Sequence, residues 1–324
     1  MQNANANANA NNGGGGSGDV EVAPQAECIL LEKHVEVEEG QPPVPPSWDC
    51  ELTSPADVAA AGNRRFIQID GLPEEVQSKA QSGRTTLLLP GSGAKINGNA
   101  GRLTIPPGLE IATGYQEQRG QRPITPGGPE DTGRPDGVGG GGGRRLAALG
   151  NKETVVVYVN NNSASGAQTT SLSKATLSNR VFGTTGDSVN LRSQYSACSA
   201  EAIDFFPSTR AGVGVDAEAG IVTVNTAVTL TADNNSNDMA NAVTDQLEAM
   251  YGGSVPFDHV LICAPPGTFD AVAWAYLNNW LSIYNDNWCQ EVSAQMHEVG
   301  HNLGLGHANE GDAEYNDQSG MVSP

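Results

Sequence analysis

The sequence predicts an α/β layer structure for the C-terminal half of the chain, preceded by a small β-rich domain. From Thr154 onward, continuous β-branched runs alternate with a helical repeat of apolar residues, which is typical of strands covered by helices. Up to residue 113 the apolar runs are short and bounded by Gly, Pro and Asp. Between these regions lies a segment too rich in Gly and Pro to form a packed core.

The C-terminal half contains three runs that we expect to be strands: Val155–Val159, Ile221–Val224 and Phe257–Cys263. The first is uninterrupted by polar residues, as expected for a parallel strand buried on both faces. A helix is expected where apolar residues recur at every third or fourth position, at Met239, Val243, Leu247 and Met250. Gly252-Gly253 should end it.

The chain is expected to divide into four segments: low-complexity, disordered residues 1–22, a β-rich domain over 23–113, a Gly/Pro-rich linker over 114–150, and the α/β domain over 151–324. The β-rich domain contains four expected strands, Ile29–Val37, Arg65–Ile69, Thr85–Leu89 and Arg102–Ile105. The linker holds the dibasic pair Arg144 and Arg145, which is either part of a solvated linker or an exposed processing site.

Charge and hydropathy exclude some classes of function. The formal net charge of −20 argues against nucleic-acid binding, which needs a basic surface, and disfavours anionic membranes. No apolar run approaches the roughly 18 residues of a membrane span. Residues 1–18 are Asn, Ala and Gly repeats without the apolar core of a signal peptide, so no signal peptide is visible.

The five cysteines contain no CxxC pair, which argues against a zinc ribbon or a thioredoxin-type site. Disulfides would fit an extracellular protein, and the odd count leaves at least one thiol unpaired or bonded to another chain.

The segment His297–His307 reads H-E-x-x-H-x-x-G-x-x-H. His297 and His301 lie four residues apart, so on a helix both imidazoles project from one face and can bind one zinc ion. Glu298 would then lean over the metal as the catalytic base, taking a proton from a bound water molecule.

Gly304 tolerates the positive φ at which a chain leaves a helix, so His307 can return as a third ligand. Three protein ligands leave one position open, as in a catalytic zinc site. The motif uses three of the five histidines in the chain. The alternatives are a zinc site that only supports the fold, or histidines of an ordinary helix and loop.

This extended motif resembles that of the metzincin metalloproteases. Within them, Trp280–Cys289, Ser293–His297 and the tail Tyr315–Met321 resemble the gametolysin family, peptidase family M11, and the resemblance covers residues 150–324. It implies an α+β, metzincin-like fold: a twisted mixed sheet with an antiparallel edge strand, an active-site helix and a Met-turn. It also implies a zinc-dependent endopeptidase of the extracellular matrix or cell wall.

The resemblance assigns further roles. Met321 matches the Met-turn beneath the zinc, although it could also be a methionine in a frayed C-terminus. Ala271–Leu277 would be the edge strand that pairs with an extended protein or peptide substrate, or else an internal strand.

The β-rich domain would correspond to a propeptide of a zymogen. The thiolate of Cys28 or of Cys50 could occupy the fourth zinc position and so inhibit the zymogen. The alternative is a Cys28–Cys50 disulfide or two inert thiols. Two of Cys198, Cys263 and Cys289 can form a disulfide.

The chain ends three residues after Met321, whereas metzincins continue with a pocket wall and a helix. The resemblance therefore predicts a C-terminally truncated catalytic domain. Two functions follow: a zinc metalloendopeptidase made as a zymogen, or a catalytically incomplete zinc-binding surface or structural protein derived from such a protease.

Overall fold

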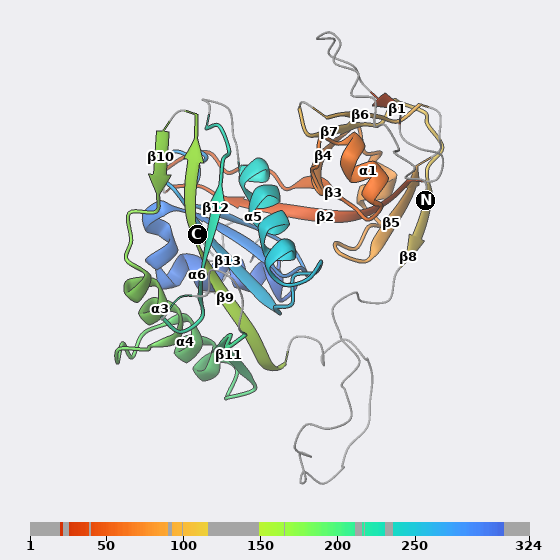
Figure 1. Cartoon of the computed structure of the whole chain (residues 1–324). Coiled ribbons are helices and arrows are strands. Elements are labelled where there is room, and N and C mark those ends of the chain that lie inside the picture. Colours follow the sequence, from red (N-terminus) through yellow and green to blue (C-terminus); the bar gives the residue numbers. More distant parts are fainter. Residues whose placement is uncertain are drawn as a thin grey trace, which may run out of the picture.

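The structure is a computed structural model of the 324-residue chain (Figure 1). It describes residues 20–21, 26–38, 40–89, 93–98, 100–115, 149–164, 166–210, 216, 218–230 and 236–307. We refer to residues 20–115 as the N-terminal part and to residues 149–307 as the C-terminal part.

The C-terminal part is built on seven strands: β9 (Gly150–Ser163), β10 (Gly166–Thr169), β11 (Ile203–Pro207), β12 (Ile221–Thr226), β13 (His259–Ala264), β14 (Ala273–Tyr276) and β15 (Leu281–Asn285). The long strand β9 pairs in parallel with β11, β12 and β13, and β13 pairs in parallel with β15. Strand β14 runs antiparallel to β15. The prediction of a mixed α/β fold with a twisted mixed sheet is therefore confirmed.

Helices cover both faces of this sheet: α3 (Lys174–Phe182), α4 (Leu191–Cys198), α5 (Ser236–Met250), the 3-10 helix η1 (Asp286–Gln290) and α6 (Val292–Asn302). Val155 and Val157 share a core with the apolar face of α5. Val156, between them, belongs to the core formed with α3, α4 and α6. The uninterrupted valine run is apolar on both sides because a helical layer packs against each face.

The N-terminal part consists mainly of strands: β1 (Val20–Glu21), β2 (Ala26–Glu36), β3 (Ser47–Leu52), β4 (Phe66–Asp70), β5 (Thr85–Leu89), β6 (Lys95–Asn97), β7 (Arg102–Thr104) and β8 (Ala112–Tyr115). Two short helices, α1 (Pro55–Ala60) and α2 (Glu74–Gln77), accompany them. Fifteen buried residues between Ala26 and Ile105 form a core of their own.

Strand β2 joins the two parts into one sheet. It pairs with β3 and β5 and also, antiparallel, with β14. In Figure 1 it runs as a long strand from the N-terminal part onto the C-terminal part. Ile29, Leu31 and Phe66 belong to the same core as α5. The strand expected within Ala271–Leu277 is therefore internal in this structure, because β2 occupies its outer edge.

Among the described residues, the helices are all too short or too polar to cross a membrane.

Candidate metal centre

Helix α6 carries the first two histidines of the motif, as predicted. It ends in a Schellman motif: the Leu305 amide donates to the Gly300 carbonyl at 2.9 Å and the Gly304 amide donates to the His301 carbonyl at 2.8 Å. Gly304 has φ +88°, which confirms that this glycine ends the helix.

The nitrogens of His297 and His301 point to one place. The His301 ring is oriented by a contact between its Nδ1 and the Leu305 carbonyl oxygen at 2.8 Å. Because a carbonyl can only accept, Nδ1 carries the proton and the Nε2 lone pair is free to bind a metal. That Nε2 lies 3.1 Å from Nε2 of His297. Two nitrogens that each lie about 2.0–2.1 Å from one tetrahedral zinc are about 3.4 Å apart, so the spacing suits a shared ion.

His307 returns to the same cluster after the turn at Gly304. Its ring centroid lies 4.7 Å from that of His301 and 5.3 Å from that of His297. The structure therefore brings the three predicted ligands together.

Two residues of β2 join the cluster, and the sequence prediction missed both. One atom each from His34, His301 and His307 lie within 4.8 Å of one another, and the same is true of Glu36, His297 and His307. Glu36 Oε2 is 3.4 Å from Nε2 of His297. The alternation of a strand indicates that Glu32, His34 and Glu36 share one face of β2, but it does not place that face beside α6.

Glu298, the predicted base, is buried beside the histidines. Its side chain is 1% exposed, and neither carboxylate oxygen has a hydrogen-bond partner in the described part of the chain. Burial, and then the charge of Glu36, raises the pKa of Glu298 well above its usual value. Burial also raises the pKa of Glu36 to about 7.

The pKa of His301 shifts in the opposite direction, below its usual value. Burial lowers its pKa to about 2, with smaller contributions from His297 and His34. The imidazole is therefore neutral, which is the form that binds a metal.

These residues fit a divalent cation. Buried carboxylates without partners are costly, and a cation among them would offset that cost. Imidazole nitrogens with a carboxylate form a donor set that suits zinc.

Hydrogen bonds from outside the cluster fix the position of α6. The Asn302 Nδ2 group donates to the carbonyl oxygens of Tyr276 at 3.0 Å and Leu281 at 2.9 Å, which ties the end of the helix to β14 and β15. Tyr195, which belongs to α4, donates a hydrogen bond of 2.7 Å from its hydroxyl to the Met296 carbonyl oxygen. The neighbouring strands and α4 therefore hold the helix that presents the histidines.

The cysteines require a correction. Cys28 and Cys50 form a disulfide between β2 and β3, so neither is the inhibitory thiol that was one of the two predicted possibilities. The two residues lie diagonally across the antiparallel pair of β2 and β3, because Cys28 is in register with Leu52 and Cys50 is in register with Leu30. Cys263 and Cys289 form a second disulfide, and Cys198 is a free, exposed thiol.

Met321, Arg144 and Arg145 lie outside the described residues. The Met-turn and the processing site therefore stay predictions.

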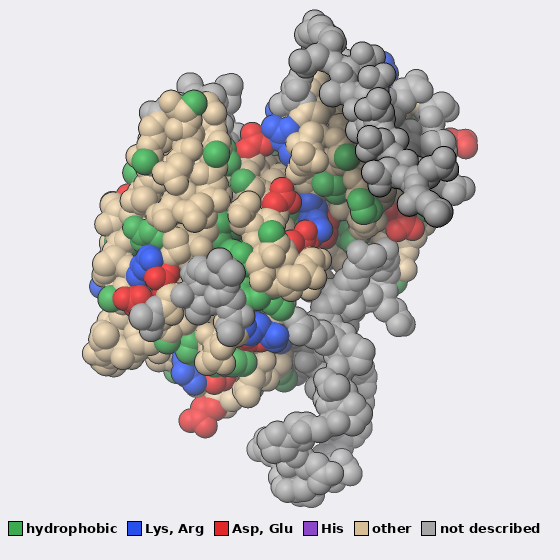
Figure 2. Space-filling view, in the orientation of Figure 1, with side chains coloured by type: hydrophobic (Ala, Val, Ile, Leu, Met, Phe, Trp, Pro, Cys, Tyr) green, Lys and Arg blue, Asp and Glu red, His purple; other side chains and the backbone are tan. Residues whose placement is uncertain are grey.

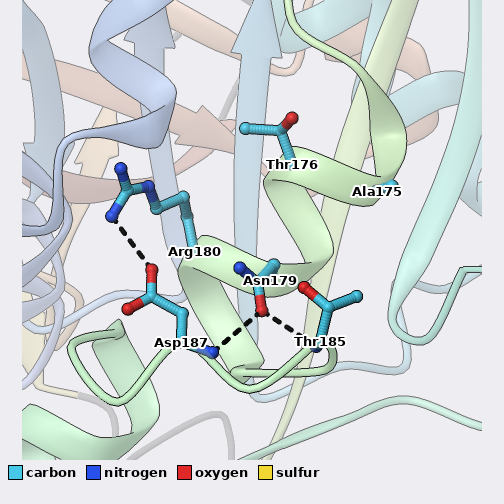
Figure 3. Close-up of a pocket in the computed structure, with 6 residues that line it drawn as sticks. All are labelled: Ala175, Thr176, Asn179, Arg180, Thr185 and Asp187. Atoms are coloured by element: carbon cyan, nitrogen blue, oxygen red, sulfur yellow. Dashed lines mark hydrogen bonds and ion pairs between the residues drawn. The ribbon is translucent and has the colours of Figure 1, made fainter.

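A hollow of about 330 Å³ lies at α3 and the loop that follows it (Figure 3). Its polar groups bond to one another: Arg180 pairs with Asp187 at 2.9 Å, and the Asn179 side-chain oxygen accepts from the Thr185 amide at 2.9 Å. These contacts stabilise the loop, and we assign the hollow no chemistry.

Much of the histidine cluster is buried: His297 is 4% and His301 is 0% exposed, whereas His307 is partly exposed. On the face shown in Figure 2, acidic and basic side chains are interspersed and no histidine is visible among the described atoms.

Comparison with protein families gives one match. The family described as gametolysin peptidase M11 matches residues 154–323, which is just over half of the chain and includes all four motif residues. A comparison with curated proteins gave no match. The matched region begins in β9 and contains strands β10 to β15, helices α3 to α6 and the three motif histidines, but not His34 or Glu36 of β2. The chain belongs to the gametolysin peptidase M11 family, which identifies it as a member of a metallopeptidase family with protein substrates.

Proposed function

We propose that the chain is a zinc-dependent metalloendopeptidase, made as a zymogen, that cleaves proteins of an extracellular matrix or cell wall. His297, His301 and His307 hold the zinc, and Glu298 is the catalytic base. The observation that carries the proposal is the convergence of the His297 and His301 Nε2 atoms, 3.1 Å apart, beside a buried and unpaired Glu298 carboxylate.

Bound zinc would supply Lewis acidity, which polarises a peptide carbonyl and makes water a better nucleophile. Residues of the chain orient the ligands and transfer the protons. Leu305 keeps His301 in the tautomer whose Nε2 is a ligand. Glu298 accepts a proton at its carboxylate from the attacking water and passes it to the nitrogen of the leaving amine. A cation beside Glu298 would lower its raised pKa toward the range of a useful base.

The substrate site is the edge of β14. An extended peptide would bind there through main-chain hydrogen bonds, next to the histidines. In the full chain β2 occupies this edge, which supports the zymogen proposal. Cleavage at Arg144-Arg145 would separate the N-terminal part from the peptidase, and Met321 would lie beneath the zinc.

The extracellular location is supported by the two disulfides. Cys28–Cys50 and Cys263–Cys289 suit an oxidising compartment and would be uncommon in a reducing one.

The test is Glu298→Gln in the full chain after limited digestion with a protease that cuts at Arg144-Arg145. The variant should keep about one zinc per chain, because the three histidines remain, while hydrolysis of a denatured protein substrate falls by at least about a thousandfold, since both proton transfers are lost. Zinc content and product release are the two measurements.

The matched control is Glu291→Gln. Glu291 precedes the same helix and is exposed, so its removal should leave activity within about twofold. Activity of the Glu298→Gln protein close to that of wild type would contradict the assignment.

The alternative is a catalytically incomplete zinc-binding surface or structural protein, and the observation in its favour is the burial of His297 and His301. It predicts that the digested wild-type chain binds zinc without any hydrolysis that a chelator abolishes.

A further inference from the structure

Strand β2 occupies the position where an extended substrate would bind. It runs antiparallel to β14, with Ala273 opposite Glu36 and Ala275 opposite His34. Main-chain hydrogen bonds lie at both ends of this strand pair. The Leu277 amide donates to the Glu32 carbonyl and the Val272 amide donates to the Glu36 carbonyl, both at 2.9 Å. A peptide that adds to a sheet edge uses the same type of bond, so β2 and a substrate would compete for β14.

His34 projects from β2 into the histidine cluster. Its ring stacks on His301 with centroids 4.5 Å apart and meets the edge of His307 at 4.8 Å. The residue is 5% exposed, and neither of its ring nitrogens has a hydrogen-bond partner within the described ranges, although Nε2 lies 3.3 Å from Glu32 Oε1. A buried imidazole in this state is costly unless another partner, such as a metal, accepts a lone pair.

The neighbouring residue holds β2 from the opposite face. Lys33 donates from Nζ to the Asn237 side-chain oxygen at 2.7 Å, and the same ammonium lies 4.3 Å from the centroid of the Trp274 ring. Because side chains alternate along a strand, Lys33 anchors β2 against α5 and β14 while His34 faces α6. The anchor thus keeps the His34 ring beside His301.

The chemistry of the cluster favours His34 over a thiol. Cys28 and Cys50, the cysteines of the N-terminal part, are bonded to each other. His34 is a nitrogen donor of the kind already present three times in the cluster, and a fourth protein ligand converts an open zinc site into a closed one.

We propose that β2 keeps this peptidase latent by lying on β14 in place of a substrate and by providing His34 as a fourth imidazole ligand to the metal of His297, His301 and His307. This inference rests on the proposed zinc site and adds its regulation. It places the inhibitory group in a strand that must leave before a peptide can bind.

The first experiment uses the full chain loaded with Co²⁺, whose visible spectrum reports the number and type of ligands. His34→Ala should change the spectrum, because a solvent molecule replaces an imidazole, and should weaken Co²⁺ binding against a competing chelator by more than about tenfold.

Val35→Ala is the matched control, since Val35 is adjacent on β2 but packs with the core on the other side of the sheet. It should leave both the spectrum and the affinity unchanged. His34→Gln, which retains a polar side chain, repeats the test if His34→Ala fails to fold.

The second experiment supplies the strand as a separate peptide. A synthetic peptide of residues 29–36 should inhibit the digested wild-type chain, and the same peptide with His34→Ala should inhibit at least about tenfold more weakly, a loss of about 1.4 kcal/mol. A peptide with Val35→Ala should retain more of its inhibition than the His34→Ala peptide.

The outcomes separate the two proposals. If wild type and His34→Ala bind Co²⁺ equally and give the same spectrum, the role of His34 is wrong while the metal site stands. If the wild-type chain binds no Co²⁺, the proposed metal site itself is wrong. Equal inhibition by the wild-type and His34→Ala peptides would also overturn the role of His34.

Discussion

His259 illustrates how a single buried residue makes the stability of the protein depend on pH. It lies at the start of β13, 4% exposed, with its ring against Phe205 at a centroid distance of 5.2 Å. Burial, and then the positive charge of Lys152, lowers its pKa to about 3. The folded protein therefore holds this imidazole in its neutral form.

The sign of the pH effect follows. Above the unfolded-state pKa of about 6.5 the residue is neutral in both states and has no effect. As the pH falls below that value, the unfolded chain gains a proton that the folded chain does not, so stability decreases down to about pH 3. At pH 4.5 the expected loss is about 3 kcal/mol, since one pH unit corresponds to about 1.4 kcal/mol.

Urea unfolding of wild type and His259→Gln at pH 7 and pH 4.5 measures this effect. The wild type should lose about 3 kcal/mol more than the variant, because the contributions of other titrating groups, including Glu36 and His301, cancel in the difference. Equal losses in the two proteins would show that His259 titrates normally in the folded state.

The turn after α6 is the element on which the third ligand depends. Gly304 has φ +88°, and a Cβ added there would meet atoms of Asn278 only at 3.9 Å. Space is therefore available, and the cost of Gly304→Ala comes from the backbone: about 1–2 kcal/mol for a left-handed residue with a side chain. Relief of that strain would displace His307, so zinc affinity should fall as well.

Gly306→Ala is the control for this prediction. Gly306 lies two residues further on, and a Cβ there meets no atom within 4 Å. Thermal unfolding and competition with a chelator should show that only Gly304→Ala lowers both stability and zinc affinity. A larger effect of Gly306→Ala would mean that the geometry at Gly304 does not position His307.

At the scale of the whole molecule, polar side chains of α5 hold the N-terminal and C-terminal parts together. Asn241 is buried, and its oxygen accepts from the amides of Arg65 and Phe66, both at 2.8 Å. Its nitrogen donates to the Phe66 carbonyl at 2.9 Å. Tyr276 extends the interface, since its hydroxyl donates to Asp49 at 2.7 Å.

Asn241→Ala should destabilise the protein by about 2–4 kcal/mol, because three main-chain groups of the N-terminal part, two of them buried, would lose their side-chain partner. Asn225→Ala, which removes an exposed side-chain bond of 3.3 Å, should cost less than about 0.5 kcal/mol. Chemical unfolding gives the difference, and hydrogen exchange should locate the loosened amides at Arg65 and Phe66. If the two variants lost similar amounts of unfolding free energy, Asn241 would not stabilise the contact between the N-terminal and C-terminal parts.

Much of the C-terminal part could be predicted from sequence because its signals are local. The valine run, the repeat along α5 and the glycine after α6 each reflect a preference of the backbone or of an apolar face within a few residues. Helices α3 and α4 and strand β15 were missed because their apolar residues are fewer and their positions depend on packing against the sheet. The expected strands of the N-terminal part coincide closely with β2, β4, β5 and β7.

The sequence by itself determined the three histidines and Glu298, because a helical repeat of four and a terminating glycine bring these residues to one point wherever the helix lies. Only the tertiary structure decided that His34 and Glu36 belong to the same cluster. They are separated from the motif by more than 250 residues, and their position depends on β2 pairing with β14, a contact between distant segments that no local pattern specifies.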